Sequence, residues 1–162
     1  MANMMRWRYG DTNPRLCAVD SATVIEIGDL VYLDTDDVKP ATSQADATSP
    51  TLNQQAFHDK FAGVAAQASA AGDTDDIRVD TTGVFEFDAA SATFEIGDLI
   101  GAAENGTGDG ILNQTVIAAV TPAATEGIGT VAKREPSAVT KVLVDIQSTL
   151  LSPLQGVQAV QT

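Results

Sequence analysis

The sequence is poor in cysteine, histidine, aromatic residues and positive charge. Cys17 is its single cysteine and His58 its single histidine among 162 residues, so the chain forms no internal disulfide and has no zinc-ligand spacing. Nine lysines and arginines stand against 22 aspartates and glutamates, for a formal net charge of −13. This acidity repels phosphate, so we expect no nucleic acid among the partners.

Long apolar runs are also missing. None approaches the roughly 20 residues that cross a bilayer, so the sequence predicts no association with a membrane. Residues 1–9 carry arginines but no apolar segment follows them, and we expect no signal peptide. Because Cys17 is the only cysteine, we expect the protein to be made and used where thiols stay reduced, or in a particle assembled there.

Catalytic patterns fail on inspection. The run Asp80-Thr81-Thr82-Gly83 resembles the Asp-Thr-Gly of aspartic proteases with an extra threonine, but the corresponding later segment is Asp145-Ile146-Gln147-Ser148. A carboxylate dyad needs two equivalent loops, and this chain offers one. His58 has no serine or cysteine in a recognisable nucleophile setting. We predict that the protein is not an enzyme and has no catalytic residues.

Ligand-binding patterns are equally incomplete. The acidic runs at residues 34–37 and 73–76 suggest calcium, but an EF-hand starting at Asp34 would lack its glycine and its final glutamate. We expect solvated turns and no metal site, with a weak cation site at a subunit contact left open. The glycines at residues 127–132 fit a dinucleotide fingerprint, yet β-branched residues continue where a helix is required. We expect a strand there and no cofactor.

The strongest positive feature is an internal repeat. Glu26-Ile27-Gly28-Asp29-Leu30-Val31 returns as Glu95-Ile96-Gly97-Asp98-Leu99-Ile100, and a Gly-Val-Ala-like strand follows each copy. Two copies are too few for a solenoid, so we expect one closed β-domain with the copies in equivalent places. Gly28 and Gly97 should each lie in a tight turn with positive φ, next to Asp29 and Asp98.

Alternating apolar and polar residues between glycine and aspartate turns predict a small all-β barrel or sandwich. The domain should span 19–148, with related units at about 24–88 and 93–147 and a tail at 149–162. We expect a long exposed loop over 34–51, and one short helix from Leu52 to about His58 with a capping box from Thr51 to Gln54. The strands are expected at 23–27, 30–34, 63–66, 77–80, 83–88, 115–120, 129–133 and 139–146, with a strand pair around a Gly-Asp turn at 94–100.

Residues 1–18 read as an extended N-terminal arm outside the domain. Three of the nine basic residues lie in it, together with two large aromatic residues. Such residues anchor interfaces, so the arm is expected to clamp a neighbouring subunit, and its removal should leave the domain folded. A disordered terminus is the alternative. The expected interface residues are Arg6, Trp7, Arg8, Tyr9 and Arg15.

The order of these motifs resembles the small capsid decoration proteins of tailed bacteriophages, most closely the DUF2190 group. The resemblance covers about Val24 to Asp145, and its most specific parts are residues 83–87 and 94–99. It implies a β-tulip-like barrel on the outer capsid surface of a virion, a homotrimer that cements the major capsid protein. The alternatives are a ligand-binding or enzyme-associated β-barrel module, or a tail or fibre component.

Overall fold

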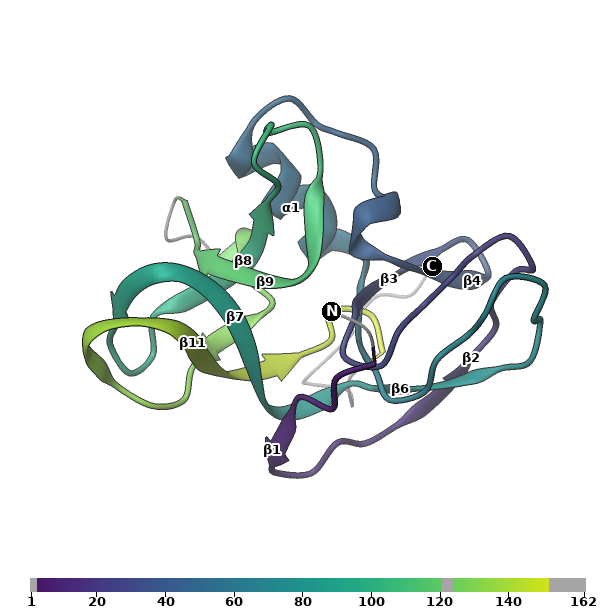
Figure 1. Cartoon of the computed structure of the whole chain (residues 1–162), viewed down its shortest axis with the longest axis horizontal. Helices are drawn as coiled ribbons and strands as arrows, with labels where there is room; N and C mark the ends of the chain where they lie inside the picture. The colour runs from purple at the N-terminus through teal and green to yellow at the C-terminus, as the bar shows by residue number, and fades with distance from the viewer. Residues whose placement is uncertain (1–2, 121–123, 152–162) are drawn as a thin grey trace, which may run out of the picture.

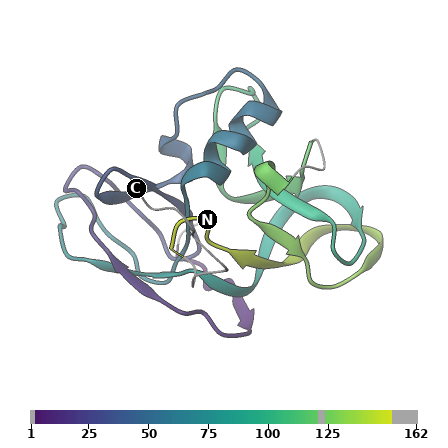
Figure 2. The ribbon, with the colours of Figure 1, turned by 180° about the vertical axis from the view of Figure 1, so that it is seen from behind.

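The computed structural model describes residues 3–120 and 124–151, which form two β-sheets and one α-helix (Figure 1). Part of the first sheet closes on itself as a five-stranded barrel. The second sheet lies beside the barrel, and the helix lies over the junction between them, as the reverse view also shows (Figure 2). The predicted small all-β barrel fold is confirmed.

The barrel closes because one long strand pairs with two different strands along the same edge. Its strands, in spatial order, are β7 (Thr82–Phe94), β11 (Glu135–Gln147), β10 (Gly129–Val131), β8 (Leu99–Glu104) and β9 (Ile111–Ala118). β11 pairs along the length of β7, while β9 pairs in parallel with its second half, at Asp88 and Ala89. The first half of β7 pairs with a further strand, β1 (Trp7–Tyr9).

The second sheet has five antiparallel strands and repeats the strand order of the barrel. They are β2 (Arg15–Cys17), β6 (Ile77–Asp80), β5 (Phe61–Ala65), β3 (Leu30–Asp34) and β4 (Asp37–Pro40). The same order arises in the barrel when each strand number is raised by five. Register agrees as well, because Val31 pairs with Gly63 as Ile100 pairs with Gly129. The internal pseudo-repeat therefore extends to five strands in each unit.

The two repeated turns have the same backbone hydrogen bonds. Gly28 and Gly97 have φ values of 98° and 87°, as predicted. In each turn the aspartate N–H donates to the glutamate carbonyl at 3.1 Å, between Asp29 and Glu26 and between Asp98 and Glu95. In each turn the aspartate side chain also accepts a hydrogen bond from the backbone N–H of that turn's glutamate, at 2.9 Å in the first turn and 3.0 Å in the second. These are type II turns, which require the glycine.

The α-helix α1 spans Pro50–Lys60 and begins earlier than expected. Its N-cap is Ser49, whose hydroxyl accepts from the backbone N–H of Leu52, and Pro50 occupies the first turn, where its missing N–H costs nothing. The predicted capping box at Thr51 is therefore wrong. Two short 3-10 turns, η1 (Ala41–Ser43) and η2 (Ala124–Glu126), complete the described elements.

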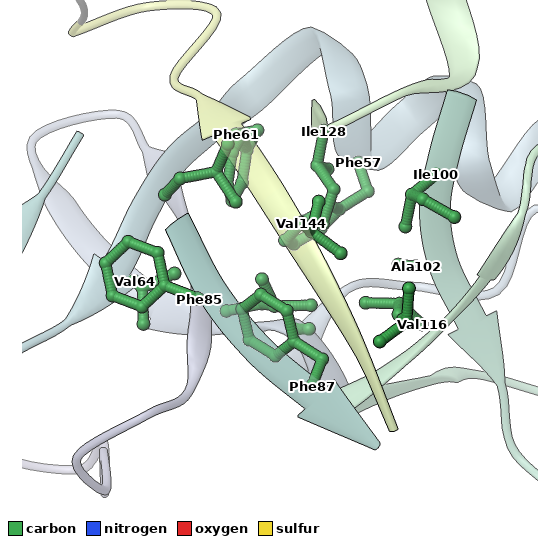
Figure 3. Close-up of a cluster of buried hydrophobic side chains, with 14 of the residues drawn as sticks. Phe57, Phe61, Val64, Phe85, Phe87, Ile100, Ala102, Val116, Ile128 and Val144 are labelled. Atoms are coloured by element: carbon green, nitrogen blue, oxygen red, sulfur yellow. The ribbon is translucent and has the colours of Figure 1, made fainter. Parts of the chain in front are cut away.

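The main core fills the barrel and extends to the helix (Figure 3). Phe85 and Phe87, two residues apart on β7, both point inward, as predicted, with ring centroids 6.2 Å apart. Phe57 of α1 and Phe61 of β5 pack together, with ring centroids 5.5 Å apart, on the side of the core that faces the second sheet. A smaller core lies within the second sheet around Ile25, Val31, Val38 and Val79.

Two sequence-based expectations about the first unit are wrong. The segment 34–51 is not one exposed loop, because β4 pairs with β3 and buries Val38 and Ala41 completely. Residues 23–27 form no strand and contribute a single bridge between Ile25 and Ser69. In 34–51 the acidic and threonine-rich composition conceals which alternate side chains face the core, whereas 23–27 has β-branched residues but no neighbouring strand beyond that bridge.

Residues 3–18 are extended but are not separate from the domain. β1 adds to the barrel sheet and β2 adds to the second sheet, so this segment belongs to both halves. Most of the predicted tail lies outside the described residues. Its first residue, Thr149, lies close after β11 and donates through its hydroxyl to the carbonyl of His58.

Candidate functional site

The outer strand β1 carries an exposed apolar surface. Trp7 is 42% exposed, Tyr9 51% and Met5 54%, and these alternate residues define what we call the β1 edge surface. The Trp7 indole N–H donates to the carbonyl of Gly10 at 3.0 Å, which holds the ring against the turn after the strand. β1 ends the order of the sheet, so its outer backbone groups face away from β7. The arrangement is suited to contact with another protein.

Arg6 corrects the expectation that all arm residues face a neighbour. Its side chain is 1% exposed and lies inside the fold. It donates to the Gln114 side-chain oxygen at 2.6 Å, to the Glu86 carbonyl at 3.0 Å and to the Asp88 carboxylate at 3.1 Å. Gln114 in turn donates to Asp29 at 2.8 Å. Arg6 thus fastens the N-terminal segment to the barrel and to the first repeated turn.

The other two arginines of the predicted interface stay at the surface. Arg8 donates to Glu86 at 2.9 Å, and both side chains are partly exposed. Arg15 on β2 contacts the Asn13 side chain at 3.1 Å and is exposed. Leu16, beside Arg15, is exposed too, on the edge of the other sheet. Arg8 accompanies the β1 edge surface, whereas Arg15 belongs to a different edge.

The repeated aspartates occupy unlike environments. Asp29 is buried, and this desolvation raises its pKa, although hydrogen bonds from Glu26 and Gln114 oppose the shift. Asp98 is exposed. The sequence signals the shared turn, but it contains no signal that Arg6 and Gln114 cover only the first copy.

The candidate catalytic residues are held by structural contacts. Asp80 is buried, which raises its pKa against the opposing effect of Arg78, whose Nε lies 3.5 Å away. Thr81 donates through its hydroxyl to the carbonyl of Asn13 at 2.7 Å. The His58 ring nitrogen Nδ1 lies 2.7 Å from the carbonyl of Gly127 and joins α1 to the segment before β10. These contacts connect elements of the fold.

The remaining expectations concern the single thiol, metal binding and membrane spans. The thiol of Cys17 is buried, and burial raises its pKa. Within the described ranges, no three cysteine, histidine or acidic side chains gather as a metal site would need. Asp34, in the first acidic run, pairs instead with Lys39 at 2.9 Å. No helix in the described part has the length and apolar character for a membrane span.

A hollow of about 530 Å³ lies among β7, β8, β9 and the start of α1. Its walls are largely apolar, with small alanines such as Ala90 and Ala103, and two carboxylates, Asp88 and Glu104, at its border. Ile117 and Val120 line it and remain partly exposed. This hollow could not be predicted from the sequence, because its walls come from separate strands.

Comparison with known proteins adds no relative: no family model, no curated protein and no solved structure matches this chain.

Proposed function

We propose that this protein is a structural component of a bacteriophage virion that binds the outer capsid surface and stabilises the shell. The observation that carries the proposal is the β1 edge surface, where aromatic side chains stay exposed beside Arg8. Tryptophan, tyrosine and arginine are the residues that most often anchor protein interfaces. The choice of a capsid as partner rests on the resemblance of the repeated motifs to phage decoration proteins.

The acidity of the chain bears on how copies would be arranged. With a formal net charge of −13, neighbouring copies repel one another unless basic groups or apolar contacts meet between them. A homotrimer would need such contacts between its subunits. Binding only to the assembled shell would stabilise the shell by mass action. No enzymatic step is part of this proposal.

The test is co-sedimentation with capsids of the phage that encodes the chain, purified without this protein. Wild type should pellet with the capsids in a saturable manner. Trp7→Ala should weaken binding by about 2 kcal/mol, roughly 30-fold in Kd, if Trp7 is a central anchor. Leu16→Ala is the matched control, because Leu16 is also exposed but lies on the other sheet.

Thermal melting of both variants checks that the fold is intact. Absence of wild-type co-sedimentation would overturn the capsid proposal. Equal binding by wild type and Trp7→Ala would show that the β1 edge surface does not contribute to capsid binding. The mass in solution, from light scattering, tests the trimer.

The apolar hollow favours a second candidate, a ligand-binding module. Its volume falls in the range of small-molecule sites, and we propose that it would accept a compact apolar ligand. A fluorescent apolar probe should then bind, and Ala103→Phe, which fills the hollow, should abolish the signal. Probe binding that Ala103→Phe leaves unchanged would eliminate this candidate.

A further inference from the structure

The first repeated turn is covered by an extended segment of the same chain. The backbone N–H of Met4 donates to the carbonyl of Ile27 at 2.9 Å, and the Asn3 side chain accepts from the Ile27 N–H at 3.0 Å. The contact is close: a Cβ built on Gly28 would lie 2.4 Å from the Met4 carbonyl oxygen. Residues 3–6 therefore use both backbone groups of Ile27 and the space above the glycine.

The second turn has the same backbone but no such cover. Ile96, the equivalent of Ile27, is 63% exposed, and a Cβ on Gly97 would meet nothing within 4 Å. Among the residues that the structure describes, no hydrogen bond reaches the backbone N–H or carbonyl of Ile96. An apolar side chain and an unpaired donor and acceptor thus stand together at the position that residues 3–6 occupy on the first turn.

We propose that the Glu95–Asp98 turn is a docking site for an extended segment of a partner protein, bound as residues 3–6 bind the first turn. The first turn indicates the chemistry of the segment. One side-chain amide would accept from the Ile96 N–H, and the next backbone N–H would donate to its carbonyl. Glu95 is already paired with Arg134 at 2.8 Å, so the exposed carboxylate of Asp98 is the charge that favours a basic segment over an acidic one. Only the identification of the partner as a capsid protein rests on the proposed function.

A type II turn allows the docking groups to be removed without changing the turn. Ile96 is its second residue, where φ is negative and proline is favoured. Ile96→Pro therefore deletes the N–H and the branched side chain while preserving the turn. Ile96→Ala is the matched variant, because it shortens the side chain and retains the N–H.

The probe is a synthetic peptide of residues 3–9, the segment that covers the first turn, added to the isotope-labelled full chain and followed by NMR. In wild type we expect saturable shifts of the Gly97 and Asp98 amides, and slower hydrogen exchange at the Ile96 amide in proportion to the fraction bound. The Ile27 turn should not respond, because it is already covered. A peptide with Asn3→Ala should bind more weakly.

The shifts should be lost in Ile96→Pro and retained, at lower affinity, in Ile96→Ala. No saturable shift up to the solubility limit of the peptide would overturn the proposal, as would equal shifts in wild type and Ile96→Pro. The result is independent of the capsid experiment, because it uses neither capsids nor variants of the β1 edge surface.

Discussion

Gly28 and Gly97 occupy the same position in the repeated motif but differ in the space around them. Both have positive φ, which costs an alanine about 1–2 kcal/mol. Gly28 also lies under the Met4 carbonyl, where a Cβ would be 2.4 Å from the oxygen, whereas Gly97 has open space. We expect Gly97→Ala to lower the free energy of unfolding by about 1–2 kcal/mol and Gly28→Ala by clearly more.

Urea denaturation of the two variants measures the difference. The pair controls for backbone strain, because the turns share their hydrogen bonds and differ in what covers them. Equal losses would mean that the N-terminal segment does not rest on the first turn in solution.

Arg6 is the residue whose role differs most from its predicted one. It is buried with three hydrogen-bonded partners, and its guanidinium lies 6.0 Å from the centroid of the Phe87 ring. Arg6→Met leaves Gln114 and Asp88 without that donor, and we expect a loss of about 3 kcal/mol in the free energy of unfolding. Arg8→Met is the control, with a loss of about 0.5 kcal/mol, because its pair with Glu86 is partly exposed.

Chemical denaturation again supplies the measurement. If Arg6→Met were as mild as Arg8→Met, the N-terminal segment would be the detachable arm that the sequence suggested.

Among the elements, α1 begins at a side-chain cap and buries polar residues beside Phe57. Asn53 and Gln54 are buried, and Gln54 accepts from the Val120 N–H at 2.9 Å and donates to the Ala102 carbonyl at 3.3 Å. We expect Ser49→Ala to cost about 1 kcal/mol, because the Leu52 N–H then loses its acceptor.

Thr51→Ala tests the alternative cap and should be nearly neutral, since alanine has the higher helix propensity. The midpoints of thermal unfolding of the two variants decide between the caps. A larger loss for Thr51→Ala would restore the capping box expected from the sequence.

For the whole molecule, two aspartates whose pKa values shift in opposite directions, buried Asp80 and partly exposed Asp88, contribute to the response to pH. Burial raises the pKa of Asp80, so its contribution to stability is present at low pH and is lost as pH rises through the folded value. Burial alone would also raise the pKa of Asp88, but hydrogen bonds from Lys141 and Arg6 hold it below its ordinary value. Its contribution is present at neutral pH and is lost as pH falls through that lowered value.

We therefore expect two asparagine variants to change stability in opposite directions at about pH 7, well above the ordinary aspartate pKa. Asp80→Asn removes a desolvated charge and should stabilise, and Asp88→Asn removes a paired charge and should destabilise. The Asp80 difference should shrink as pH falls to about 4, near the ordinary aspartate pKa, whereas the Asp88 difference should persist there and be lost only at lower pH. Urea titrations at the two pH values give the comparison, and an Asp80 difference independent of pH would contradict it.

The sequence by itself determined the β-rich fold, the two equivalent turns and the inward direction of Phe85 and Phe87. These features are local, since a type II turn is specified by its glycine and a strand face by every second residue. The repeat can be recognised in the sequence for the same reason. Each copy contains the residues that form the turn, and the turn sets the register of its strands.

Only the tertiary structure decided what covers each turn. Arg6 meets Glu86, Asp88 and Gln114 across separations of 80, 82 and 108 residues, and no local pattern encodes such contacts. The same holds for the parallel pairing of β7 with β9 that closes the barrel. Burial of a charged side chain depends on partners that arrive from distant strands, so the exposed turn at Ile96 and the covered turn at Ile27 have the same sequence but different surroundings.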